Sequence, residues 1–129
     1  MRVALVRQTV WGNDFITACN SGIIRVYDGT RPTNGEDSPT GTLLAELTFN
    51  ATSFDLVART LTARAITEDS VANNTGTPTH AVLYQSNGTT IIGNVSAAVG
   101  SGELNFASLI TAGNKVQCSS FVVTMPVGS

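Results

Sequence analysis

Residues 22–49 read GIIRVYDGTRPTNGEDSPTGTLLAELTF, and this stretch decides the fold class. A short apolar segment runs into the polar turn Asp28-Gly29-Thr30-Arg31-Pro32, crosses a loop of Gly, Pro, Asn, Asp and Thr, and continues as an alternating segment. Strict alternation of apolar and polar residues is typical of a strand with one buried face. The stretch therefore predicts a two-sheet β scaffold that carries an exposed loop.

The same period of two continues towards the C-terminus. It recurs over 61–65 and 80–84, and a last apolar segment over 115–125 stops at Pro126. Asn87-Gly88 supplies the positive φ angles of a tight turn, so residues 80–94 are expected to form a hairpin. The predicted core residues are Ile24, Val26, Leu43, Leu47, Phe49, Leu61, Leu83, Ile91, Leu104, Phe106, Val116 and Val122.

Seven or eight short strands separated by turn residues indicate an all-β fold, an antiparallel β-sandwich or jelly roll. We expect a single domain of this kind over residues 21–129. The preceding residues, 1–20, are expected to form an N-terminal arm or a short helix. Such a helix would start near Asn13 or Asp14 and end before Gly22.

The composition limits the possible partners. Charged residues make up 12% of the 129 residues, the net charge is −2 and the pI is near 5.1. A protein that neutralises a phosphate backbone needs a broad basic surface, so no nucleic-acid partner is expected. The apolar runs are far shorter than the roughly 20 residues of a membrane span, and no signal-peptide pattern is visible. We expect a soluble, non-secreted protein with no membrane partner.

Reactive side chains do not group along the sequence. The single histidine, His80, lies near Pro78 at an expected strand start, where a surface or edge imidazole is favoured over a catalytic base. Cys19 and Cys118 match no metal-ligand spacing, and two buried reduced thiols are favoured over a disulfide. The acidic pairs at 36–37 and 68–69 lack the spaced ligands of a calcium loop, so solvated loops are favoured there. We expect no catalytic residue, no metal ligand and no cofactor.

The segments 29–41, 67–79 and 95–103 are long for plain hairpin connections, and loops of that length often contact a partner. Trp11 and Phe15 form an apolar pair outside the strand pattern, which favours a partner-clasping arm as the alternative to a helix. The candidate partner-binding residues are Trp11, Phe15, Asp28, Arg31 and Asp37.

Several pieces of the chain resemble one family in their order. The run SGIIRVYDGTRP over 21–32 and the run GTLLAELTF over 41–49 are similar to a group of small virion proteins of tailed bacteriophages. Later pieces are similar too, namely GTPTHA at 76–81, QSNGTT at 85–90 and FVVTMP at 121–126. The likeness spans most of residues 21–126 and consists of turn and strand patterns, with no catalytic signature.

The resemblance implies a capsid decoration, or cement, protein. Such a protein is a compact β-sandwich or jelly roll that binds as an oligomer on the outside of an icosahedral shell. The implied partners are the major capsid protein and copies of the chain itself, with a trimer favoured over a dimer. The implied location is the capsid exterior in the virion, and the host cytoplasm during assembly.

Two other classes remain as alternatives. A tail module that binds a receptor or carbohydrate would use the same scaffold and expose aromatic platforms, but most of the five Phe residues fall at core positions. A small hydrolase would need a nucleophile beside an oriented base, and His80 has no such neighbour in sequence. The sequence therefore favours a binding protein over an enzyme.

Overall fold

The computed structural model describes residues 2–3, 13–33, 37–39, 41–57, 60–100, 102–106 and 109–124. In this part of the chain strands dominate, as the alternation predicts, and the described helix is short. The elements are β1 (Arg2–Val3), α2 (Asn13–Cys19), β2 (Ile23–Tyr27), β3 (Leu43–Thr48), β4 (Phe54–Val57), β5 (Thr60–Ala63), β6 (His80–Tyr84), β7 (Ile91–Ala98), β8 (Leu104–Phe106) and β9 (Cys118–Thr124).

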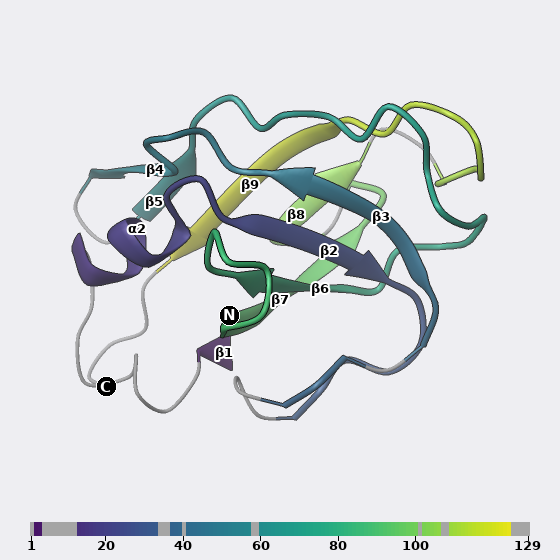
Figure 1. The fold of residues 1–129 in the computed structure, drawn as a ribbon, viewed down its shortest axis with the longest axis horizontal. Coiled ribbons are helices and arrows are strands. Elements are labelled where there is room, and N and C mark those ends of the chain that lie inside the picture. Colours follow the sequence, from purple (N-terminus) through teal and green to yellow (C-terminus); the bar gives the residue numbers. More distant parts are fainter. Residues whose placement is uncertain are drawn as a thin grey trace.

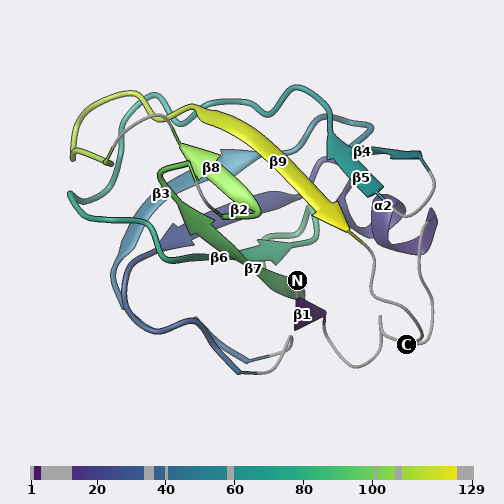
Figure 2. The same cartoon turned by 180° about the vertical axis from the view of Figure 1, so that it is seen from behind.

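The strands belong to one curled sheet with the order β3-β2-β6-β7-β8-β9-β5-β4, and β1 pairs with β7 (Figure 1). The predicted hairpin over 80–94 is confirmed: β6 and β7 are antiparallel, and Gly88 in their turn has a φ of +74°. Figure 2, which shows the molecule from behind, has β8 and β9 side by side on the face turned away from the viewer in Figure 1.

The pairing of β7 with β8 is parallel, so the prediction of a purely antiparallel arrangement is wrong at this point. The predicted loop 95–103 is also too long, because β7 continues through Ala98. After Ala98 the chain turns back against the strand it has just left. A Cβ on Gly102 would lie 3.0 Å from the Ala98 nitrogen, so a larger residue there would require the backbone to shift by a few tenths of an ångström.

The curled sheet is nearly closed by the segment 67–69. Thr67 exchanges backbone hydrogen bonds with Thr48 of β3, and Asp69 exchanges them with Val116, just before β9. The Asp69 carboxylate also accepts a hydrogen bond from the Glu46 nitrogen at 2.9 Å. The chain between β5 and β6 therefore bridges two distant strands, and the apolar interior lies inside the curl.

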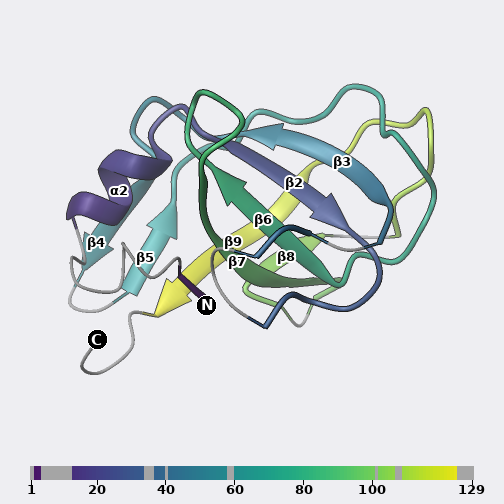
Figure 3. The same ribbon diagram turned by 60° about the horizontal axis from the view of Figure 1, so that its bottom comes forward.

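The short helix predicted before Gly22 is confirmed as α2, which lies beside β4 and β5 (Figure 3). Phe15 and Cys19 are one helical turn apart, and both side chains are fully buried. The Phe15 ring lies 5.6 Å from that of Phe54, and Phe54 also packs against Phe49 and Phe121 at 5.3 and 5.4 Å. This group of four rings anchors α2 to the inner face of the sheet.

Three predicted core residues are misplaced, each on a strand that contains a β-bulge. Leu43 and Ile91 are only partly buried, and Val122 is 42% exposed. The register shifts between Val26 and Tyr27, between Leu83 and Tyr84, and between Asn105 and Phe106. One extra residue at each shift reverses the phase of alternation, so the inward positions are taken by Leu44, Ile92, Phe121 and Val123. The other nine predicted core residues are buried.

Strand β6 is buried on both faces, whereas its alternation predicts a half-buried strand. Ala81 and Leu83 belong to the main apolar cluster, but the alternate residues Val82 and His80 are fully buried outside it. Asn94, opposite Val82 on β7, is fully buried as well. The outer face of β6 and β7 is therefore covered, and its polar side chains form the site described next.

Candidate functional site

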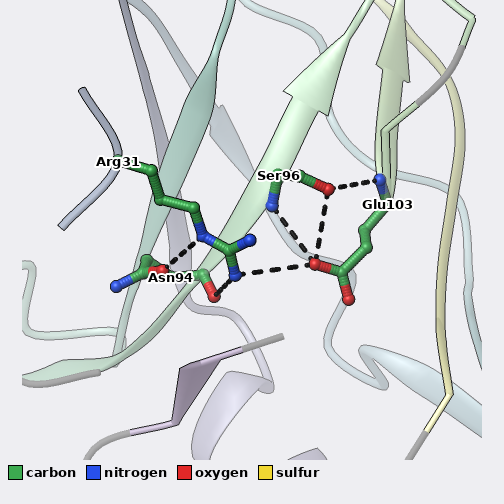
Figure 4. A network of polar contacts seen from close by, with 4 residues as sticks. All are labelled: Arg31, Asn94, Ser96 and Glu103. Atoms are coloured by element: carbon green, nitrogen blue, oxygen red, sulfur yellow. Dashed lines mark hydrogen bonds and ion pairs between the residues drawn. The ribbon is translucent and has the colours of Figure 1, made fainter. Parts of the chain in front are cut away.

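A polar network connects the loop after β2 to the outer face of β7 (Figure 4). We call its four residues, Arg31, Asn94, Ser96 and Glu103, the clasp. Arg31 donates from Nε to Asn94 Oδ1 at 2.7 Å and from Nη2 to the Asn94 carbonyl oxygen at 3.0 Å. The planar guanidinium suits such a two-point contact, because its N–H groups are fixed in one fork. The contact holds the start of the loop against the centre of the sheet.

Glu103 completes the clasp from the start of β8. Its Oε1 lies 3.7 Å from Arg31 Nη2 and accepts hydrogen bonds from the Ser96 nitrogen and Oγ at 3.2 and 3.4 Å. The Glu103 nitrogen in turn donates to Ser96 Oγ at 3.0 Å. These reciprocal bonds hold the return of the chain from β7 to β8, and they place a carboxylate beside the guanidinium in a half-buried setting.

The base of the loop 29–41 is closed by Asp28 and Thr42. The Thr42 nitrogen donates to Asp28 Oδ1 at 2.6 Å, and the Asp28 nitrogen donates to the Thr42 carbonyl oxygen at 3.2 Å. Gly41 has a φ of +85°, and a Cβ there would lie 2.7 Å from Asp28 Oδ1. The two ends of the loop are therefore held together, and the loop leaves the sheet from a fixed base.

Thr79 and His80 lie next to this base. The Thr79 hydroxyl lies 2.8 Å from the Gly29 carbonyl oxygen and 3.1 Å from His80 Nδ1. The His80 ring stacks on Tyr27, with the ring centroids 5.6 Å apart and the planes inclined by 12°. His80 is fully buried, so the prediction of a surface or edge imidazole is wrong. A flat ring that stacks on a tyrosine and bonds a neighbouring hydroxyl fits inside a covered sheet face.

The pKa shifts of the two rings at this site agree with a covered outer face of β6 and β7. Burial, followed by the nearby Arg31 charge, lowers the pKa of His80. Burial is also the main cause that raises the pKa of Tyr27 to about 12. Both rings are therefore neutral at pH 7, and the charges at this face are those of Arg31, Glu103 and Asp28.

No protein-family model, curated protein or solved structure matches this chain.

The five predicted partner-binding residues lie in different environments. Asp28 and Arg31 come together at the base of the loop 29–41, where both hold the loop in place. Asp37 is half-buried on the same loop. Phe15 is fully buried in the aromatic group, so its prediction as a surface contact is corrected: its ring fills the space between α2 and Phe54. Trp11 lies outside the described residues.

Asn94, Ser96 and Glu103 were not predicted as parts of the site. The parallel return from β7 to β8 brings Ser96 and Glu103 together, and no local pattern signals that return. The pairing of Arg31 with Asn94 joins two segments whose contact depends on the whole sheet order. A weak signal is present: Asn94 and Ser96 alternate with apolar residues over 93–97, the pattern of a strand with a polar face.

Two shallow hollows lie elsewhere on the described surface. One has a volume of about 250 Å³ and is lined by residues that include Phe106, Leu109, Asn114 and Lys115. The other, about 170 Å³, is lined by residues of 63–66 and 118–121. Lys115 in the first hollow lies 3.6 Å from a Glu68 carboxylate oxygen. Neither hollow brings together the nucleophile, base and orienting group that a hydrolase needs.

The remaining reactive groups are separate from one another. Cys19 and Cys118 are reduced thiols, one fully buried and one half-buried, and burial raises the pKa of Cys118. Among the residues that the structure describes, no three His, Cys, Asp or Glu side chains gather where a metal ion could bind. In the same described ranges, no helix has the length and apolar character needed to cross a membrane.

Proposed function

We propose that this protein is a structural virion component of a tailed bacteriophage that binds the outside of the capsid as a decoration, or cement, protein. In this role it stabilises the head by bridging subunits of the major capsid protein. It acts as a homo-oligomer, with a trimer favoured over a dimer, and it works without catalysis or a cofactor. It does not bind nucleic acid or a membrane, and it occupies the capsid exterior after assembly in the host cytoplasm.

One observation carries the proposal: the loop 29–41 is held at its base by Asp28 and Thr42 and along its start by Arg31. A contact loop whose ends are already held in place loses less conformational entropy on binding than one with free ends, so more of the contact energy remains as affinity. The same stretch, residues 21–49, contains the longest runs that resemble the phage virion family. The hydrogen bonds at the base and start of the loop and the resemblance to phage virion proteins thus favour the same surface for contact with the shell.

The fold suits a bridging module. We infer that the curled sheet acts as a β-sandwich of the jelly-roll kind, with its two halves facing one another across the aromatic group. A rigid module that contacts several subunits gains from effective concentration, because each further contact forms within an assembly that is already joined. Binding to the intact shell also stabilises that state by mass action, and many copies multiply a modest effect per site.

The deciding experiment uses phage heads that lack this protein. Such heads should assemble but break more readily than complete heads under heat, chelation or osmotic shock. Purified protein should rebind them in a fixed ratio to the shell subunits and restore their resistance. A cryo-EM reconstruction of the rebound particles then gives the position and symmetry of the protein.

The main alternative, a tail module that binds a receptor or carbohydrate, gives the opposite result. Loss of such a module abolishes adsorption and leaves the heads robust. A few copies per particle, confined to the tail, would refute the capsid proposal and support this alternative.

A further inference from the structure

His80 presents a buried polar atom whose role the fold alone does not explain. The residue is fully buried, and its Nε2 has no hydrogen-bond partner among the described residues. A buried polar atom without a partner is rare, because its desolvation is not compensated. His80 is also the single histidine of the chain, the residue type that titrates nearest to neutral pH.

The hydrogen bonds around Thr79 fix the proton on the ring. A threonine hydroxyl has one hydrogen to donate. Two carbonyl oxygens lie within its reach, that of Gly29 at 2.8 Å and that of Tyr27 at 3.3 Å, and the shorter contact takes the hydrogen. Thr79 Oγ1 therefore accepts from His80, so the neutral ring carries its proton on Nδ1. Nε2 is left with a bare lone pair. A proton added from solvent must go to this atom.

Protonation at Nε2 is costly in the closed structure. It creates a buried N–H with no acceptor, and it adds a positive charge near Arg31. The groups that face or adjoin the ring are Tyr27 from β2, Asp28 and Arg31 from the loop, and Ser96 from β7. Ser96 binds the Glu103 carboxylate. Asp28 favours the charged ring, but its effect is smaller than those of burial and Arg31.

We propose that His80 is a pH-sensitive release for the segment 29–33: protonation of Nε2 detaches this segment from the outer face of β6 and β7. The contacts that hold this segment there include the hydrogen bond from Thr79 to Gly29 and the two hydrogen bonds from Arg31 to Asn94. Both attachments lie beside the ring. Opening them lets water reach Nε2 and separates the Arg31 charge from the imidazolium, while the backbone pairs of β6 and β7 remain.

The sign of the effect follows from the lowered pKa of His80. The closed form binds fewer protons than an open form in which the ring has its ordinary pKa near 6.5. The closed form therefore has its full stability above that value. It becomes less stable relative to the open form as the pH falls from 6.5 towards the lowered pKa.

The test uses NMR on the intact protein, with Nε–H of Arg31 as the probe of the closed clasp. At pH 7.5 the ring should show the Nδ1–H tautomer, and the Arg31 Nε–H should be protected from exchange with solvent. Between pH 7.5 and pH 5, the protection factor should fall by about tenfold or more, as expected for a local opening. The fall should follow the titration of His80 itself, and amides in the β6–β7 ladder should keep their protection.

Two variants separate the effect of His80 from that of Glu103, the carboxylate of the clasp. His80→Phe retains a flat ring against Tyr27 and removes the titration, so its Arg31 protection should not change with pH. Glu103→Gln retains an acceptor for Ser96 and removes the carboxylate, so it should keep the pH-dependent fall. The reverse pattern would assign the effect to Glu103 and overturn the proposal. Constant Arg31 protection while His80 titrates in the unmodified protein would also overturn it, even if His80→Phe fails to fold.

The release is a property of the purified protein, so it can be measured whether or not phage heads require this protein. Conversely, absence of the pH-dependent release would not bear on whether the protein binds phage heads, which the rebinding experiment measures separately.

Discussion

Arg31 binds both oxygen atoms of Asn94, a residue 63 positions further along the chain. The side-chain oxygen receives Nε–H and the main-chain oxygen receives Nη2–H, so the loop after β2 is fixed on β7 by one side chain. Asn94 is fully buried, and truncation of its side chain removes Oδ1, the acceptor of Arg31 Nε–H, while the main-chain oxygen stays in place.

Asn94→Ala should lower the free energy of unfolding by about 1–3 kcal/mol, the usual cost of leaving a buried polar partner unsatisfied. Arg31→Lys should also destabilise the protein, because an ammonium group does not form the same fork. Urea denaturation at pH 7.5 measures both effects, with an unchanged m-value as the check that the unfolded state is the same. An Asn94→Ala protein as stable as the unmodified chain would show that the clasp is not needed to hold the loop.

Gly41→Ala and Gly113→Ala form a matched pair for the base of the loop. Both glycines have nearly the same positive φ, +85° and +84°, but a Cβ on Gly41 would overlap Asp28 whereas one on Gly113 meets nothing within 4 Å. Gly113→Ala should cost about 1–2 kcal/mol for the left-handed backbone alone. Gly41→Ala should cost clearly more, because the base must also open. Equal losses in thermal or urea unfolding would mean that contact with Asp28 does not constrain the loop.

Phe15→Ala should destabilise the protein by about 3–5 kcal/mol, the range for removing a buried phenylalanine ring. The reason is the cavity left between α2 and Phe54, which the surrounding rings fill only in part. Val122→Ala is the control, since Val122 is 42% exposed and its loss should be within about 0.5 kcal/mol. Retained stability of Phe15→Ala, together with weaker binding to heads, would return Phe15 to the contact surface.

Asp55→Asn should leave the stability unchanged within the error of a denaturant measurement. Arg64 lowers the pKa of Asp55 through hydrogen bonds of 2.8–3.2 Å, but both side chains are half-exposed and solvent screens the pair. The small contribution is present above the ordinary carboxyl pKa and is lost as the pH falls through the lowered one. A large loss at pH 7 would show that this pair matters to the β4–β5 hairpin.

Asp37→Arg should weaken binding to heads while the isolated protein stays folded, because Asp37 lies on the proposed contact loop and outside the apolar cluster. Asp55→Arg is the matched charge reversal on β4, away from that loop, and should bind like the unmodified protein. Sedimentation of heads with each variant gives the bound fraction, and circular dichroism confirms the fold. The same assay applies to Trp11→Ala in the N-terminal part. Unchanged binding of both loop and N-terminal variants would place the contact surface elsewhere.

Residues 21–49 and the Asn87-Gly88 turn were sufficient to predict the strand content, because alternation and turn chemistry are local signals. The incorrectly predicted core residues lie on strands that contain β-bulges. Val116 and Cys118 set a phase that the extra residue near Ser119 reverses, so Val122 points outward although it is apolar. A bulge depends on the pairing partner and leaves no mark in the strand itself.

The site was predicted only in part for a similar reason. Asp28 and Arg31 belong to a recognisable turn, but Asn94 and Glu103, the partners of Arg31, reach it through the sheet order and the parallel return at β8. The burial of His80 also depends on what covers β6 from outside. Its place near Pro78 in sequence favoured an exposed edge, whereas the loop after β2 and the face of Tyr27 enclose it.

The bridge formed by residues 67–69 has a consequence for how copies of the chain can meet. It covers β3, whose Leu43 and Leu44 carbonyl oxygens are further bound by Asn74 and Asn73. In the described part of the sheet, the terminal strand without such a cover is β4, which is four residues long and carries Asp55 paired with Arg64. Short, charged borders resist the open-ended stacking of strands into fibrils. Many copies of the chain can therefore lie close together with little tendency to aggregate by pairing of their strand edges.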